Sequence, residues 1–200
     1  MGELSLQKQL QKTFQVLESV VCLWEKTLAD CAGTVTVVTN LCEQYSDCKG
    51  VAVEALPVGK VLPDVQERLL YKILSELDNK LANLHDKLSA VKEEQDKFCR
   101  HHDQCVKLYK RHSSELDVYK MTDSTATWPS MSAMLEILVD SECLLFDLYN
   151  MKMHWIEQLS EEKTLNSDIL AQTWSSADKD ILQNLRDSLC HLTFFVQERL

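Results

Sequence analysis

An unbroken alternation of apolar residues, at intervals of four and three positions, most constrains how this chain can fold. The alternation comprises Leu10, Phe14, Leu17, Val21, Trp24, Leu28, Cys31, Val35, Val38, Cys42 and Tyr45. Residues at this spacing form one stripe along an α-helix, which is the pattern of a coiled-coil seam. Residues 33–39 are rich in Val and Thr, which favour strands. Because the alternation continues through them in register, we expect them to be helical.

A second seam follows residues 48–63, a segment that contains two Gly and two Pro residues. It comprises Leu70, Leu74, Leu77, Leu81, Leu84, Leu88, Val91, Gln95, Phe98, His102, Cys105, Tyr109, His112 and Leu116. Pro63 predicts the start of this helix, and Asp64 and Glu67 would interact favourably with its dipole. Two apolar stripes joined by a short connection predict an antiparallel helical hairpin.

The C-terminal part predicts two shorter helices after a polar linker. Pro129 is suited to the first position of a third helix, and residues 160–175 read as a loop with a short helical piece around Ile169. Ser175 and Ser176 predict the N-cap of a last helix that ends near Glu198. The apolar faces comprise Met131, Met134, Leu135, Leu138, Leu145, Leu148, Trp155 and Leu159, then Ile181, Leu185, Leu189, Leu192 and Phe195.

The expected fold is therefore all-α, with a coiled-coil-like antiparallel hairpin and two shorter C-terminal helices packed on it as an elongated bundle. We expect one domain over residues 1–200, with the hairpin at 1–119, its connection at 48–63, a linker at 120–128 and the C-terminal helices at 129–200. Trp24 is bulky for a two-helix seam, so we expect the C-terminal helices to pack near its level. Phe194 and Phe195 are candidates for the same core or for an exposed docking tail.

The charge and the cysteines limit the compartment and the partners. The net charge of −10 disfavours direct binding to nucleic acid, since phosphate binding needs a basic face. Residues 121–200 carry 5 basic and 13 acidic side chains, which leaves open a basic partner or a solvated helix face. The N-terminus shows no secretory signal and the chain no membrane segment. Because no C-x-x-C pair occurs, we expect the eight Cys residues to be reduced and mostly buried.

Residues 99–105 are the one segment that suggests a metal site. His101 and Cys105 are four positions apart, and Cys99 and His102 are three apart, so each pair could present two zinc ligands. The two pairs point in different directions on one helix and cannot complete a tetrahedral site. We therefore expect no metal and no cofactor.

Polar residues in the second seam are candidates for contact with a partner. Gln95, His102 and His112 occupy positions where apolar residues are expected, and Phe98 and Tyr109 lie nearby. Polar seam residues can fix the register of a hairpin, and aromatic residues are enriched at interfaces. Both interpretations, register within the chain and a protein interface, remain open for these five residues.

The sequence contains none of the common catalytic or nucleotide-binding motifs, so we expect no catalytic residues and no enzymatic activity. An adaptor and a structural coiled-coil subunit, such as a tether or a cytoskeletal or kinetochore component, are both compatible with the seams.

Residues along nearly the whole chain resemble the AIRIM family of ribosome maturation factors. They are Leu23, Trp24, Asp30, Cys31, Asn40, Leu41, Glu43 and Gln44, then Ala55, Leu56, Pro63, Asp64, Glu67, Arg68 and Leu69, then Pro129, Ser130, Met134, Leu135, Glu136, Leu138, Asp140 and Glu142, and finally Trp174, Asp180, Leu182, Gln183, Phe194, Phe195 and Glu198.

The resemblance implies a non-catalytic adaptor in a complex with Afg-type AAA+ ATPases and a second small helical subunit, a cyclin-dependent-kinase-interacting protein. Such a complex would release or recycle factors from cytoplasmic precursors of the large ribosomal subunit, and would also act in protein turnover at replication forks. The implied location is the cytoplasm and the nucleus, with pre-ribosomal particles contacted indirectly.

Overall fold

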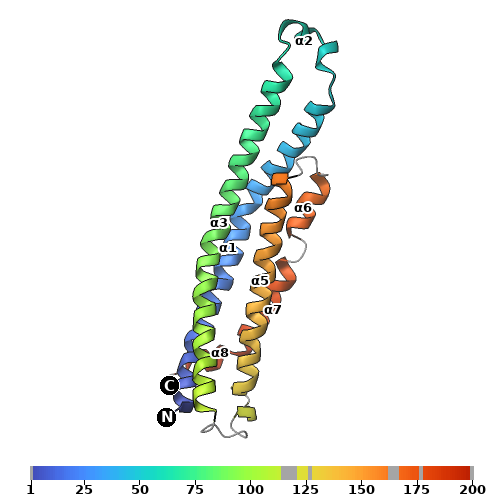
Figure 1. The fold of residues 1–200 in the computed structure, drawn as a ribbon. Coiled ribbons are helices and arrows are strands. Elements are labelled where there is room, and N and C mark those ends of the chain that lie inside the picture. The colour runs from blue at the N-terminus through green and yellow to red at the C-terminus, as the bar shows by residue number, and fades with distance from the viewer. Residues whose placement is uncertain (1, 114–120, 126–127, 162–166, 176–177, 199–200) are drawn as a thin grey trace. The chain divides into compact units, whose positions relative to one another are not determined.

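Every regular element in the described part of the chain is a helix. The computed structural model describes residues 2–113, 121–125, 128–161, 167–175 and 178–198. The elements are α1 (Gly2–Gly50), η1 (Val53–Ala55), α2 (Pro57–Val61), α3 (Val65–His112), α5 (Met131–Glu161), α6 (Ser167–Ser175), α7 (Asp178–His191) and α8 (Thr193–Gln197) (Figure 1). The predicted all-α class is confirmed.

The helices form two compact units. Unit 1 contains residues 1–26, 90–149 and 177–200, and unit 2 contains residues 27–89 and 150–176. Helices α1, α3 and α5 each contribute residues to both units. The expected linker at 120–128 is described only at residues 121–125 and 128.

Helices α1 and α3 pair in antiparallel fashion within each unit. In unit 1, a Cβ atom at Gly2 would lie 2.5 Å from His112 Cγ, and Thr13 Oγ1 is 3.2 Å from Cys105 Sγ. In unit 2, Lys87 Nζ donates to Asp30 O over 2.8 Å, and Gln66 Nε2 donates to Cys48 O over 2.7 Å. In both units the partner number in α3 falls as the number in α1 rises, so the predicted hairpin pairing is confirmed.

The two seams are buried along most of their length. In the first seam only Leu28 and Tyr45 are half-buried and the other members are buried. In the second seam the members from Leu77 to Cys105 are buried, while Tyr109 is exposed and Leu116 lies outside the described residues. Apolar seam side chains of unit 1 and of unit 2 are thereby removed from water, which is the main stabilising term for such helices.

The segment rich in Val and Thr lies within α1, as the register of the seam predicts. Thr36 Oγ1 donates to Ala32 O over 3.1 Å, and Thr39 Oγ1 donates to Val35 O over 2.9 Å. These hydroxyl groups bond to the preceding helical turn, so they need no other partner. Burial of Val35 and Val38 outweighs the weak helical propensity of β-branched residues.

The helix boundaries differ from those expected at the connection between the seams. Helix α1 continues to Gly50, and residues 53–61 form η1 and α2 rather than an irregular loop. Pro57, not Pro63, occupies the first position of a helix, α2. Helix α3 starts at Val65, and Asp64 O accepts a hydrogen bond from Arg68 N over 3.1 Å. Asp64 therefore lies immediately before the first turn of α3.

The boundaries of the C-terminal helices also differ from those expected. Ser130 Oγ accepts a hydrogen bond from Ala133 N over 3.2 Å, so Ser130 caps α5 and Pro129 lies before the helix. Ser175 is the last residue of α6 rather than a cap, and Ser176 lies outside the described residues. The single last helix is divided into α7 and α8 at Leu192, whose N–H donates to Leu189 O over 3.0 Å. This three-residue turn is tighter than an α-helical turn.

An aromatic cluster packs the C-terminal segment against α1 in unit 1. The ring of Phe195 lies 6.4 Å from Phe14 and 5.2 Å from Trp128, with both pairs nearly perpendicular. Phe195 is buried, whereas its neighbour Phe194 is 65% exposed. Phe195 is therefore part of the core, and Phe194 is not.

A further helix, α7, packs against α1 near Trp24 in unit 1. Trp24 is fully buried, and the preceding helical turn carries Cys22. Arg186 of α7 forms an ion pair with Glu25 and lies 4.0 Å from Cys22 Sγ. Helix α7 thus packs against α1 beside Trp24. The bulk of this side chain had led us to expect a C-terminal helix there.

In unit 2, two tryptophans and a lysine hold α6 against α5. The rings of Trp155 and Trp174 lie 4.8 Å apart, and Trp155 Nε1 donates to Leu170 O over 3.0 Å. Lys152 is buried, with Nζ 4.7 Å from the centre of the Trp174 ring and hydrogen-bonded to Trp174 O. The carbonyl and the aromatic ring together compensate for the loss of water around the ammonium group.

Replacement of Leu84 by Asp should destabilise unit 2 strongly, because Leu84 is fully buried in the second seam. We expect a loss of about 3 kcal/mol or more, from the lost apolar contacts and the buried charge. This corresponds to a fall in melting temperature of roughly 6–12 °C for a chain of this size. Thermal unfolding followed by circular dichroism measures the effect. Asn83→Asp, which places the same group at an exposed neighbouring position, is the control, and equal melting temperatures would contradict burial of Leu84.

Candidate partner-binding sites

The five residues predicted as contact candidates divide into buried and accessible ones. Gln95, Phe98 and His102 are buried in unit 1, with exposed fractions of 1%, 0% and 7%. Tyr109 is exposed and His112 is half-buried. A partner could reach Tyr109 and His112 directly, whereas the first three side chains mainly contact residues of this chain.

His102 connects α3 to the third long helix of unit 1. His102 Nδ1 is hydrogen-bonded to a carboxylate oxygen of Glu142 on α5, and its ring stacks against Phe98 at 6.4 Å. The seam position of His102 is therefore polar because it pairs with a carboxylate. This pairing supports the register interpretation for His102, and the seam spacing alone gave no sign of Glu142 as the partner.

Two buried polar atoms near this contact have no hydrogen-bond partner in the described part of the chain. They are Gln95 Oε1 and His102 Nε2. An unsatisfied buried acceptor costs free energy, so such atoms favour any ligand or partner that supplies a donor. Gln95 also lines a surface groove, described below.

The candidate zinc ligands of residues 99–105 contact different parts of unit 1. His101 Nδ1 lies 3.2 Å from Gln9 Nε2 on α1, whereas His102 contacts Glu142 on α5. Among the described residues, no group of three or more His, Cys, Asp or Glu side chains has an arrangement that could hold a metal ion.

The cysteines are less uniformly buried than their positions predicted. Cys31, Cys42 and Cys105 are buried, but the exposed positions of Cys22, Cys143 and Cys190 show that the prediction was wrong for these three. Burial raises the pKa of Cys105 to about 11, although a hydrogen bond with Thr13 acts in the opposite direction. The same thiol therefore stays protonated and unreactive near neutral pH.

Cys99 combines burial with a neighbouring carboxylate. Burial is the largest cause that raises its pKa to about 11, and the charge of Glu142 and a hydrogen bond with Glu142 raise it further. Cys99, His102 and Glu142 thus form a small polar cluster between α3 and α5, and the carboxylate opposes formation of a thiolate.

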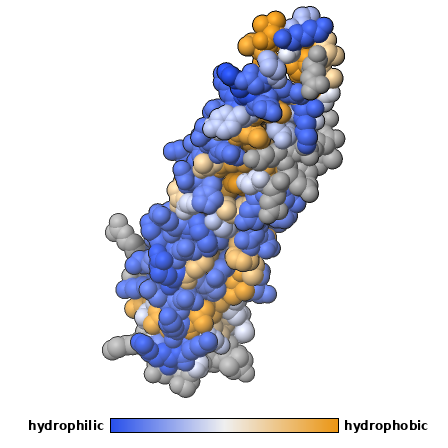
Figure 2. Space-filling view, turned by 45° about the horizontal axis from the view of Figure 1, so that its top comes forward, coloured by the Kyte–Doolittle hydropathy of each residue, from blue (hydrophilic) through white to orange (hydrophobic). Residues whose placement is uncertain are grey.

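Exposed apolar residues gather around the turn between α1 and α3 in unit 2. We name this surface the tip patch, and Figure 2 shows it at the top of the view. Val61 and Tyr71 are 77% and 76% exposed, far more than apolar residues in a folded interior. The patch, as named here, comprises Val51, Leu56, Val58, Val61, Leu62, Leu69 and Tyr71, of which Leu69 and Tyr71 lie on different faces of α3. An exposed apolar patch of this kind is typical of a protein interface.

A second apolar surface lies along α5 in unit 1. Val139, Cys143 and Phe146 are exposed and are spaced four and three positions apart, so they share one face of the helix. They line a groove of about 300 Å³ between α5 and α3, to which Gln95 and Cys99 also contribute. We name this surface the α5 groove, and its spacing fits one helix laid along it.

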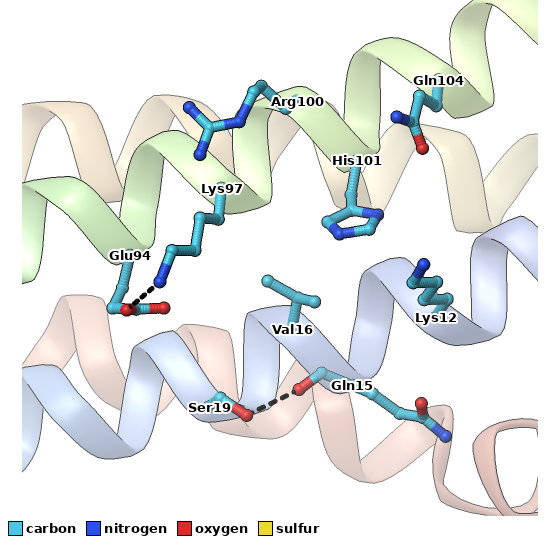
Figure 3. A pocket seen from close by; sticks show the side chains of 9 residues that line it. All are labelled: Lys12, Gln15, Val16, Ser19, Glu94, Lys97, Arg100, His101 and Gln104. Atoms are coloured by element: carbon cyan, nitrogen blue, oxygen red, sulfur yellow. Dashed lines mark hydrogen bonds and ion pairs between the residues drawn. The ribbon is translucent and has the colours of Figure 1, made fainter.

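A third surface is basic, although the chain as a whole is acidic. Lys12, Gln15, Val16 and Ser19 of α1 and Glu94, Lys97, Arg100, His101 and Gln104 of α3 line a pocket of about 660 Å³ in unit 1 (Figure 3). We name it the basic pocket. Sequence reasoning missed it, although Lys97, Arg100, Lys107 and Arg111 are spaced to share one face of α3.

The architecture and these surfaces define a class of protein: an all-α helical bundle that exposes apolar and basic surfaces. No helix in the described ranges is both long enough and apolar enough to cross a membrane. A family model described as ribosome biogenesis protein C1orf109-like matches residues 4–194. The chain belongs to this family, and the family resemblance drawn from its residues is confirmed.

Three vertebrate relatives are each described as AFG2-interacting ribosome maturation factor. The chain is 28% identical to the relative from Homo sapiens over 196 residues, which cover 98% of this chain and 97% of the relative. The relative from Mus musculus is also 28% identical over 196 residues, with 98% and 90% covered. The relative from Danio rerio is 28% identical, with 97% and 96% covered. The similarity therefore extends over the full length of the fold.

Replacement of Glu142 by Gln should accelerate alkylation of Cys99, because the carboxylate charge that raises the thiol pKa is removed. Burial remains, so the pKa of Cys99 should fall only part of the way to its ordinary value. Iodoacetamide labelling between pH 7 and 10, followed by mass spectrometry of the Cys99 peptide, measures the change.

Two controls distinguish the loss of the Glu142 charge from a local loosening of the fold as the cause of faster labelling. Asp103→Asn removes an exposed carboxylate from the same helix and should leave the Cys99 rate unchanged. Buried Cys105 should stay unreactive in the Glu142→Gln protein. Equal acceleration of Cys105 would show local unfolding instead of the predicted electrostatic effect.

Proposed function

We propose that this chain is a non-catalytic adaptor subunit of a complex with an Afg-type AAA+ ATPase. In this proposal the complex acts on cytoplasmic precursors of the large ribosomal subunit, from which it releases or recycles maturation factors. The same complex would act in protein turnover at replication forks, and the chain would work in the cytoplasm and the nucleus. The ATPase would hydrolyse the nucleotide, and this chain would position substrates.

The observation that carries the proposal is the full-length similarity to relatives whose shared description names AFG2 interaction and ribosome maturation. The family model, which describes ribosome biogenesis, supports the same process. The sequence has no phosphate-cradling loop, so the energy for the process would have to come from a partner. A bundle with large exposed apolar surfaces is suited to that binding role.

We propose the tip patch as the surface that binds the ATPase. Leu62 and Tyr71 expose large apolar areas at 51% and 76%, and neither is covered by a neighbouring element of unit 2. Aromatic and aliphatic residues at the centre of an interface contribute most of its binding free energy. The short helices η1 and α2 hold this patch in place at the end of the hairpin, through backbone hydrogen bonds such as Leu62 N to Val58 O at 2.8 Å.

The α5 groove is our proposed site for the second small helical subunit. One helix of that subunit would cover Val139, Cys143 and Phe146 and would extend the bundle of unit 1. Gln95 contributes to the lining of this groove, but it is buried and its Oε1 is closed to solvent, so the helix would contact mainly the exposed α5 residues. Tyr109 and His112 are the accessible candidates on α3 and are proposed as secondary contacts.

Affinity purification of the tagged protein should recover an Afg-type AAA+ ATPase, and the purified chain alone should hydrolyse no ATP. A variant with Val61→Ser, Leu62→Ser and Tyr71→Ser should recover at least about tenfold less ATPase, since it lacks the apolar anchors of the tip patch. Quantitative mass spectrometry of the recovered proteins measures this loss. The matched control replaces three exposed apolar residues outside both surfaces, Leu4, Val37 and Met151, by Ser.

Full recovery of the ATPase by the tip variant would refute the proposed surface but not the adaptor function. Recovery of no AAA+ ATPase by the wild-type protein would refute the adaptor function itself. The structural coiled-coil subunit, which the paired seams also allow, would then be the better interpretation.

Depletion of the protein should leave late maturation factors on cytoplasmic precursors of the large ribosomal subunit, because their release would lack the adaptor. Isolation of the precursor particles and measurement of their protein content test this expectation. Re-expression of the wild-type chain should restore the normal composition, whereas the tip variant should not. Particles of normal composition after depletion would contradict a role in factor release.

A further inference from the structure

The basic pocket of unit 1 shares no residue with the tip patch or with the lining of the α5 groove. Its lining contains the cationic side chains Lys12, Lys97 and Arg100 and one acidic side chain, Glu94. Figure 3 shows Glu94 paired with Lys97, which leaves the ammonium group of Lys12 and the guanidinium group of Arg100. Neither of these two groups forms an ion pair with any residue that the structure describes. The described part of the chain therefore leaves the positive charge of these two groups unpaired within the pocket.

His101 adds a neutral hydrogen-bond donor to the pocket. Gln9 Nε2 lies 3.4 Å from His101 O and 3.1 Å from Gln104 Oε1, and both oxygens can only accept, so the amide nitrogen donates. The same nitrogen lies 3.2 Å from His101 Nδ1. In the neutral tautomer that accepts from Gln9 at Nδ1, the ring proton is on Nε2, where it is available for a bound acceptor.

The surroundings of His101 also show that the pocket disfavours a further positive charge. Burial is the largest cause that lowers the pKa of His101, and the charges of Lys12 and Arg100 lower it further. A field that opposes protonation of the ring attracts an anion to the same place. An anion bound between these cations would in turn raise the pKa of His101.

The positive charge continues along α3 beyond the pocket. Lys97, Arg100, Gln104, Lys107 and Arg111 are spaced three, four, three and four positions apart, so they form a stripe on one helical face. The stripe spans about 20 Å at about 1.5 Å per residue. On α1, Lys8 lies one turn before Lys12 and extends the same surface. We name the pocket and these flanking residues the basic band.

We propose that the basic band binds an acidic segment of a partner protein, with a Glu or Asp carboxylate of that segment seated between Lys12, Arg100 and His101. The guanidinium group can hold a carboxylate through two parallel hydrogen bonds, and His101 Nε2 and the Lys12 ammonium can supply others. Carboxylates repeated at helical spacing would match the stripe on α3. Val16 provides an apolar floor for the aliphatic part of such a side chain.

The same cations could meet phosphates, but the chemistry of the pocket favours a peptide over RNA. The lining contains no Phe, Tyr or Trp ring, so a base could stack only on His101 or on the Arg100 guanidinium, and stacking is a main contribution to binding of single-stranded RNA. The net charge of −10 repels a long polyanion that extends past the band, whereas a short acidic segment carries its charge only within it. Gln15 and Gln104 supply amide groups that can bond to a peptide backbone.

Fluorescence anisotropy with the full chain and a labelled oligoglutamate peptide tests the proposal. The variant Lys12→Gln with Arg100→Gln should bind the peptide at least about tenfold more weakly, because two charge-assisted contacts are lost. The control Lys72→Gln with Lys179→Gln removes the same charge from exposed positions outside the band and should bind as the wild type does. An oligouridylate of equal charge should bind the wild type more weakly than the peptide, and added salt should weaken peptide binding.

A second measurement follows His101 by proton NMR in the wild-type chain. Saturation with oligoglutamate should raise the pKa of His101, whereas oligoglutamine should leave it unchanged. Equal peptide affinity of the Lys12/Arg100 variant and the wild type would overturn the proposal, as would an unchanged pKa of His101. Tighter binding of oligouridylate than of the peptide, lost in the same variant, would assign the band to RNA and also overturn it.

Discussion

The burial of the two apolar seams against each other is the constraint on which the rest of the structure depends. Helix α1 pairs with α3 through residues that alternate every four and three positions, and this pairing recurs in unit 1 and in unit 2. Neither helix could expose such a stripe to water, so their antiparallel packing follows directly. The same packing places Lys12 and Arg100 in the lining of one pocket of unit 1 and forms the turn that carries the tip patch in unit 2.

Contacts with α5 explain why a polar residue interrupts the second seam. His102 occupies a position that the seam would give to an apolar side chain, and Glu142 provides its partner. A paired histidine specifies which turn of α5 lies opposite α3, since a shift by one turn would take the Glu142 carboxylate away from Nδ1 of the buried His102 ring. Gln95, whose buried Oε1 has no hydrogen-bond partner among the described residues, also contributes to the lining of the α5 groove, so α3 takes part both in the seam and in this surface.

The three surfaces differ in the chemistry that they offer. The tip patch and the α5 groove are apolar and suit partners that bury aliphatic or aromatic residues, while the basic band suits carboxylates. Apolar contacts contribute mainly affinity, and charged contacts contribute mainly specificity and association rate. These three chemistries would serve the different partners of the adaptor function proposed here.

The sequence by itself determined the helical class, the two paired seams and the family, because periodicity over many residues constrains which face is buried. It did not determine helix ends such as Ser130 or the break at Leu192, which depend on single hydrogen bonds. Only the tertiary structure decided that His102 pairs with Glu142, 40 positions away, and that Phe195 is buried while Phe194 is exposed. The physical reason is that side-chain partners and solvent exposure depend on which helices meet, and no local pattern encodes contacts between distant segments.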